Sequence, residues 1–138
     1  MLNFNRLCFA VFLSAFLYCS CTHAQSNIKH VWVAREDHGD KPGIEYRLWL
    51  NDQNHIVGEM WVFTTDENGK VKERGKYPTT IKSSDQTHIT MTFTSGDGSV
   101  GEFTIRFPKG LRNHQEQAVL ESRRSQTKEE LKFERADK

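Results

Sequence analysis

Short runs of alternating apolar and polar residues recur along this chain, and clusters of turn-forming residues separate them. Examples of these clusters are NDQN (51–54), DENG (66–69) and SGDG (95–98). Runs at intervals of about 8–12 residues predict an all-β fold, and the gaps between them are too short for crossover helices. We therefore expect one antiparallel up-and-down β-barrel of about eight strands. The candidate strands cover 30–36, 43–50, 55–65, 70–77, 79–83, 87–94, 99–107, 116–122 and 128–135.

The first 24 residues differ in composition from the rest. Arg6 is their only charged side chain, residues 7–18 are almost entirely apolar, and the segment ends in the small-x-small triplet at 22–24. This pattern is typical of a secretory signal peptide, and its apolar run is shorter than the roughly 20 residues that span a membrane. We therefore expect residues 1–24 to be a signal peptide and residues 25–138 to form a single domain. The protein is then exported, either periplasmic or secreted.

All three cysteines, Cys8, Cys19 and Cys21, lie in this leader. Cleavage after Ala24 leaves a disulfide-free domain without thiol chemistry. Cleavage before Cys21 instead leaves one thiol for lipid attachment, which would tether the same domain to a membrane. Soluble processing is the favoured prediction, because Tyr18 and Cys19 differ from the aliphatic and small residues that a lipoprotein signal places there.

The charge of the mature chain is balanced. Arg6 is one of 19 Lys and Arg residues, so 18 basic side chains remain against 18 acidic ones. No basic excess of the kind that nucleic-acid binding requires is left, and we expect no nucleic-acid partner.

The sequence gives no positive sign of catalysis or of a metal site. Five histidines remain after processing and none shares the spacing of a metal motif, while no G-x-S-x-G motif is present. We therefore expect no metal and no cofactor, and we favour a non-catalytic protein. An acid–base pair assembled from separate strands is the alternative that would make it an enzyme.

Two hairpins can be placed in register from their patterns. In the hairpin over 87–107, Met91 opposite Phe103 joins the apolar positions of both strands, and Gly98 takes the left-handed turn position. In the hairpin over 43–65, the favoured register sets Tyr46 opposite Met60 and allows Asn54 the left-handed position.

The second hairpin has two possible registers with different functional meanings. The favoured one pairs Arg47 with Glu59 and presents an aromatic ridge on the reverse face. A shift by one residue would instead turn Glu59 and Trp61 to the side of Tyr46, as a polar handle in a ligand cavity. The aromatic ridge consists of Trp49, Val57, Trp61 and Phe63.

The aromatic ridge suggests a protein interface, since Trp is enriched at binding hot spots. The competing interpretation is that residues 31–33 or 110–115 cover the ridge. A barrel of eight strands can also hold one small ligand, and Gly58, Gly75 and Gly101 are candidate bends for closing it.

The segment over 70–77 fits the barrel poorly. A four-residue turn puts Glu73 on the Met60 face, while a three-residue turn puts Lys72 and Arg74 there. Either choice brings charge toward the core, so we expect this strand to be an edge or to extend past the barrel rim.

The succession of hairpins and the ending EELKFERAD resemble small lipocalin-like barrels of bacterial exported proteins. The resemblance is one of architecture, and it implies fold rather than activity. The leading hypothesis is an exported binding protein for a small apolar ligand or an exported protein partner, with site residues Trp49, Val57, Glu59, Trp61, Phe63 and Tyr46. The alternatives are an inhibitor or immunity protein that blocks a hydrolase or toxin, and an enzyme with a dispersed acid–base pair.

Overall fold

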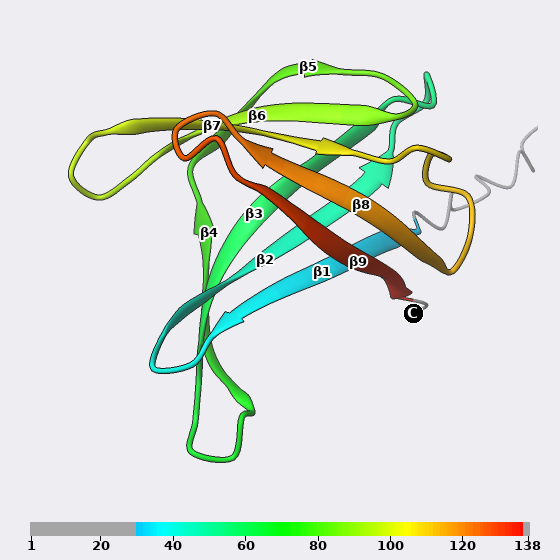
Figure 1. Cartoon of the computed structure of the whole chain (residues 1–138). Helices are drawn as coiled ribbons and strands as arrows, with labels where there is room; N and C mark the ends of the chain where they lie inside the picture. Colours follow the sequence, from blue (N-terminus) through cyan, green and yellow to red (C-terminus); the bar gives the residue numbers. More distant parts are fainter. Residues whose placement is uncertain (1–29, 137–138) are drawn as a thin grey trace, which may run out of the picture.

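The computed structural model describes residues 30–136, and that range contains nine β-strands and no helix (Figure 1). The expected signal peptide and the cleavage choice at Cys21 lie outside the described residues. None of the described residues forms a helix long and apolar enough to cross a membrane. The strands are β1 (Val31–His38), β2 (Lys41–Leu50), β3 (Ile56–Thr65), β4 (Val71–Tyr77), β5 (Thr79–Ser84), β6 (His88–Thr94), β7 (Val100–Arg106), β8 (Gln115–Ser122) and β9 (Lys128–Ala136).

The strands form one antiparallel sheet that curls into a half-barrel (Figure 1). Their order is β4-β3-β2-β1-β9-β8-β7-β6-β5, so the first and last strands meet in the middle of the sheet. The all-β antiparallel prediction is confirmed. The expectation of a closed barrel of about eight strands needs correction, because nine strands are present and β4 and β5 remain the two edges.

The sheet stays open because β4 diverges from β5 after the single linking residue Pro78. At the far end of β5 the two halves approach again, where the Ile56 amide donates to the Asp85 carbonyl oxygen at 2.8 Å. Strand β4 is highly charged, and such charges suit an edge rather than an interior strand. Its edge position agrees with the sequence prediction, and pairing of Thr64 with Glu73 places Glu73 on the Met60 side.

Both predicted hairpin registers are present. Tyr46 lies opposite Met60 in β2–β3, and Met91 lies opposite Phe103 in β6–β7. Asn54 has a φ of 59° at the β2–β3 turn. The shifted register with Glu59 turned inward is therefore wrong, because Glu59 pairs with Arg47 on the outer face.

The concave side of the sheet holds the hydrophobic core. Sixteen buried residues form one cluster, in which Phe107 and Phe133 stack edge to face with ring centres 5.0 Å apart. Tyr46 and Met60 belong to this cluster, so the positions expected to line a ligand cavity are packed against other side chains. A Cβ atom on Gly58 would lie 2.4 Å from Leu48 Cδ2, so this glycine makes room for a core leucine.

Candidate functional site

The predicted site residues separate onto two sides of the sheet. Tyr46 is buried in the core, where its hydroxyl donates to Glu36 Oε2 at 3.0 Å. The pairing of β2 with β3 places the other five on the outer face of these two strands. These five are Trp49, Val57, Glu59, Trp61 and Phe63.

The aromatic ridge is not a continuous exposed apolar strip. Phe63 is only 3% exposed, and its ring lies over Gly43 on the neighbouring strand. Trp49, Val57 and Trp61 are partly exposed. Neither segment considered as a cover lies over the ridge. Residues 31–33 belong to β1 of the same sheet, with Trp32 in the core and Val33 beside Arg47 on the outer face, and residues 110–113 line a pocket at one end of the half-barrel.

Trp61 is held in place by charged neighbours on this face. The Arg47 guanidinium lies over its ring, with Cζ 4.4 Å from the ring centre. The indole Nε1 donates to Glu59 at 2.8 Å, and Glu59 also pairs with Lys76 of β4 at 2.8 Å. Cation–π contact and hydrogen bonding therefore fix the orientation of the Trp61 side chain.

Beside Trp61 lies a buried carboxylate that three arginines surround. Glu45 is 1% exposed and accepts from Arg35 Nε at 2.5 Å, from Arg47 Nε at 2.6 Å and from Arg74 Nη2 at 3.2 Å. Burial alone would raise the pKa of Glu45, but hydrogen bonds from Arg35 and Arg47 more than offset it and the pKa is lowered. Glu45, Arg35, Arg47 and Arg74 are called the Glu45 cluster below.

The sequence interpretation missed the Glu45 cluster. Its members come from β1, β2 and β4, and β3 lies between β2 and β4, so four strands must be in register to bring them together. One signal was present in the favoured register of β2 and β3, which places Glu45 opposite Trp61 on the ridge face. An acidic residue with arginines on its own strand, on the adjacent strand β1 and on β4 of one face is the pattern that would have indicated it.

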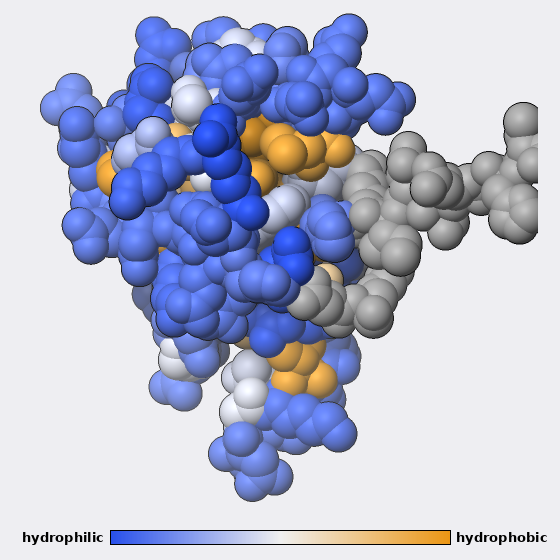
Figure 2. Space-filling view, turned by 90° about the vertical axis from the view of Figure 1, so that its right-hand side faces the viewer, coloured by the Kyte–Doolittle hydropathy of each residue, from blue (hydrophilic) through white to orange (hydrophobic). Residues whose placement is uncertain are grey.

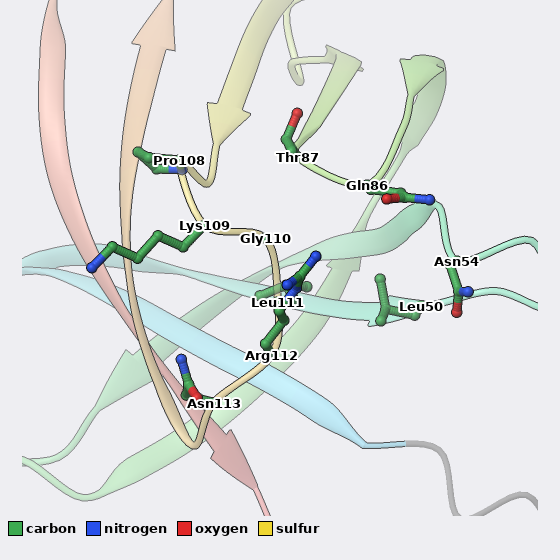
Figure 3. A pocket seen from close by; sticks show the side chains of 10 residues that line it. All are labelled: Leu50, Asn54, Gln86, Thr87, Pro108, Lys109, Gly110, Leu111, Arg112 and Asn113. Carbon is green, nitrogen blue, oxygen red and sulfur yellow. The ribbon is translucent and has the colours of Figure 1, made fainter.

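A pocket of about 690 Å³ opens at one end of the half-barrel (Figure 3). It is called the end pocket below, and three connections build it: the β2–β3 turn, the β5–β6 turn and the β7–β8 connection. Figure 2 shows this end of the molecule facing the viewer, with hydrophobic surface visible between hydrophilic side chains. The lining residues are Leu50, Asn54, Gln86, Thr87, Pro108, Lys109, Gly110, Leu111, Arg112 and Asn113.

Hydrogen bonds hold the β7–β8 connection in place as one wall of the end pocket. Buried Glu116 accepts through Oε1 from the Asn113 amide at 2.9 Å and from Asn113 Nδ2 at 2.8 Å. The indole Nε1 of Trp32 donates to the Asn113 carbonyl oxygen at 2.8 Å. Gly110 has a φ of 71°, and Leu111 next to it is buried in the core. The wall is therefore preformed.

The β5–β6 turn forms the opposite wall. Asp85 Oδ1 accepts from the amides of Thr87 at 2.6 Å and His88 at 2.9 Å. The Thr87 amide hydrogen bond is the main reason that the pKa of Asp85 falls to about 2. Asp85 therefore stays ionised and caps this turn well into the acid range.

The end pocket is electropositive. Its lining contains two cations, Lys109 and Arg112, and no carboxylate. Within residues 30–136 neither cation forms an ion pair. In Figure 3 the Arg112 side chain runs up beside Gly110 into the pocket, whereas the Lys109 side chain points away from it. Arg112 is therefore the better placed cation for a bound anion.

Another buried carboxyl group, that of Glu36, lies where β1 and β9 separate. The two strands pair only from Val31 to Val33, and Glu36 follows beyond the last pair. One oxygen of Glu36, Oε1, is buried without a hydrogen-bond donor in the described chain. Burial raises the pKa of Glu36, and the neighbouring carboxyl group of Glu129 raises it further. Neither carboxyl group lines the end pocket, so this pair is separate from it.

Within residues 30–136, no three His, Asp or Glu side chains converge as metal ligands would. Comparison with protein-family models, with curated proteins and with solved structures found no match to this chain.

Proposed function

We propose that the chain is an exported, non-catalytic binding protein that takes a small amphiphilic anion in the end pocket. The observation that carries this proposal is the pair of cations, Lys109 and Arg112, without an ion-pair partner among the described residues, in a pocket of about 690 Å³. Pockets of about 300–1,000 Å³ are typical of small-ligand sites.

The chemistry of the lining indicates the kind of ligand. An anionic head group would bind the Arg112 guanidinium, and the exposed amides of Asn54 and Gln86 offer further hydrogen bonds. An apolar part would lie against Leu50 and Leu111 at the base. A ligand that is both charged and apolar satisfies this lining better than a purely apolar one.

The proposal retains the lipocalin-like architecture and the exported location expected from the sequence. Antiparallel strands joined by hairpins curl around an apolar core, and the site opens at one end where three connections meet. The site differs in place from the interior cavity expected at first, because Tyr46 and Met60 are packed in the core.

Fluorescence titration tests the proposal directly. The probe is anilinonaphthalene sulfonate, which joins a sulfonate to an apolar ring system, with dodecanoate and dodecanol as competitors. We expect saturable binding of the dye by the mature chain and displacement by dodecanoate at lower concentration than by dodecanol.

Two single variants give the matched comparison. Arg112→Ala should weaken dye and dodecanoate binding about tenfold, as expected when a hydrogen bond to a charged group is lost. Arg124→Ala removes an exposed arginine from the β8–β9 turn and should leave binding unchanged. The proposal fails if the dye does not bind at all, or if the two variants bind equally well.

A further inference from the structure

The outer face of β1–β4 carries more hydrogen-bond donors than its own carboxylates can accept. Three guanidinium groups meet at Glu45, and each has five N–H groups, while one carboxylate accepts about four hydrogen bonds. Most of these donors must therefore go to water or to acceptors on another molecule. Arg35 is 49% exposed and Arg74 is 36% exposed, so their remaining donors are accessible.

The same face has a local excess of positive charge. Its ion-paired side chains are four cations, Arg35, Arg47, Arg74 and Lys76, and two carboxylates, Glu45 and Glu59. Ion pairing within the protein thus leaves two positive charges on this face. The mature chain as a whole is balanced, so this excess is a local property of the face.

The arginines are ordered before any partner arrives. Glu45 is buried and binds two of them through Nε at 2.5 and 2.6 Å, and Arg47 also lies over the Trp61 ring. All four residues of the Glu45 cluster lie on hydrogen-bonded strands rather than on loops. A partner would therefore lose little of its binding free energy to ordering these side chains.

We propose that the Glu45 cluster is a docking surface for a carboxylate-rich segment of a protein partner. Because Glu45 occupies the centre, the unused donors lie around it, which suits several spaced carboxylates better than one compact dianion. Partly exposed Trp61 adjoins the cluster, with Trp49 and Val57 farther along the same face. Aromatic and arginine side chains together are typical of the centre of a protein interface. This surface lies outside the end pocket and does not depend on the function proposed for that pocket.

A defined acidic peptide tests this inference. A hexaglutamate peptide and a hexalysine peptide are titrated into the full mature chain at low ionic strength, with inorganic phosphate as a competitor. Hexaglutamate should bind and weaken as salt is added, whereas hexalysine should not bind. Phosphate at the same total charge should displace hexaglutamate poorly.

Matched pairs of arginines locate the binding. The double variant Arg35→Ala/Arg74→Ala should bind hexaglutamate at least tenfold more weakly. The control double variant removes Arg106 and Arg123, which are also ion-paired but belong to the other half of the sheet, and it should bind as the unchanged chain does. Arg35→Ala alone leaves Glu45 with two arginines and should show an intermediate loss of binding. This single variant tests the inference even if the double variant does not fold.

Three results would overturn the inference. The first is absence of hexaglutamate binding, and the second is an equal loss of binding in the two double variants. The third is displacement of the peptide by phosphate at equal charge, which would make the cluster a site for a compact anion.

Discussion

The guanidinium group of Arg47 lies over the indole ring of Trp61, with Cζ 4.4 Å from the ring centre. Arg47 belongs to β2 and Trp61 to β3, so this contact joins two strands on their outer face. Through Arg47 it also links the aromatic ridge to the Glu45 cluster. The aromatic residue that the sequence marks as a binding residue is thus part of a charged assembly.

A double-mutant cycle should measure this contact. Trp61→Ala and Arg47→Ala should each lower the free energy of unfolding, and their coupling should be about 0.5–1 kcal/mol, as for a partly exposed cation–π pair. Urea denaturation of the two single variants and the double variant gives the value. The same cycle with Arg106, which lies on β7, should give coupling near zero. A coupling near zero for Arg47 as well would contradict the assignment.

Glu45→Gln should destabilise the fold at neutral pH by about 2–3 kcal/mol, because it removes the negative charge that three arginines share. The pKa of Glu45 is lowered in the folded state, so its contribution is present above its ordinary value of 4.5 and is lost as the pH falls through the folded-state pKa. The difference between the variant and the unchanged chain should therefore shrink in acid.

Glu102→Gln is the matched control for Glu45→Gln. Glu102 also pairs with two cations, Lys82 and Arg123, but it is more exposed. Its replacement should change the free energy of unfolding much less than Glu45→Gln does, because solvent screens an exposed ion pair. Urea denaturation at pH 7 and pH 3 tests both variants, and equal losses for the two would show that the burial of Glu45 has no energetic role.

Glu36→Gln should have the opposite pH dependence. The pKa of Glu36 is raised by burial and then by Glu129. The protonated carboxyl group therefore contributes its full stability below pH 4.5, and this contribution is lost as the pH rises through the folded-state pKa. The neutral amide avoids this loss, and the variant should be more stable than the unchanged chain at pH 7. Thermal unfolding at pH 4 and pH 7 measures the difference in stability between the variant and the unchanged chain, which should disappear at pH 4. Glu130→Gln on the outer side of β9 should show no such difference.

Gly43→Ala should destabilise the protein by about 2 kcal/mol through overpacking. A Cβ atom at Gly43 would lie 2.3 Å from Phe63 Cζ and 2.8 Å from the Glu36 carbonyl oxygen. Gly75→Ala on β4 is the control, since a Cβ atom there meets nothing within 4 Å. Chemical denaturation should rank the two variants clearly, and similar stabilities would mean that Phe63 is not packed against Gly43.

Glu116→Ala should affect both the fold and the end pocket. It removes the acceptor for the amide and side chain of Asn113, at a cost of about 2–3 kcal/mol, and frees one wall of the pocket. Dye binding should fall together with stability, whereas Arg112→Ala should lower binding alone. Denaturation and dye titration on the same samples separate the two effects. Unchanged dye binding by Glu116→Ala would show that the wall needs no such support.

Much of the fold could be predicted because the relevant signals are local. The register of β2–β3 follows from the alternation of apolar and polar residues along the two strands and from Asn54, which tolerates the left-handed turn conformation. The edge position of β4 follows from its charges, which have no place in a core. Both features depend on residues close together in the sequence, within a single hairpin or a single strand.

The number of strands and the opening of the sheet were harder to predict. A count of candidate runs does not show whether β4 and β5 pair, since Pro78 alone connects them and either geometry fits the pattern. The structure leaves both as edges, whereas β1 and β9, from opposite ends of the domain, pair as the first and last strands of an up-and-down barrel do.

The sequence by itself determined the antiparallel all-β architecture, two hairpin registers and the face on which Trp61 lies, because alternation and turn chemistry act between near neighbours. Only the tertiary structure decided that Arg35 and Arg74 converge on Glu45, and that Leu50, Gln86 and Arg112 border one pocket. These groups come from separate strands and connections, so their meeting depends on strand order and on the curl of the sheet. Such long-range geometry arises from packing of the whole core, which no local pattern encodes.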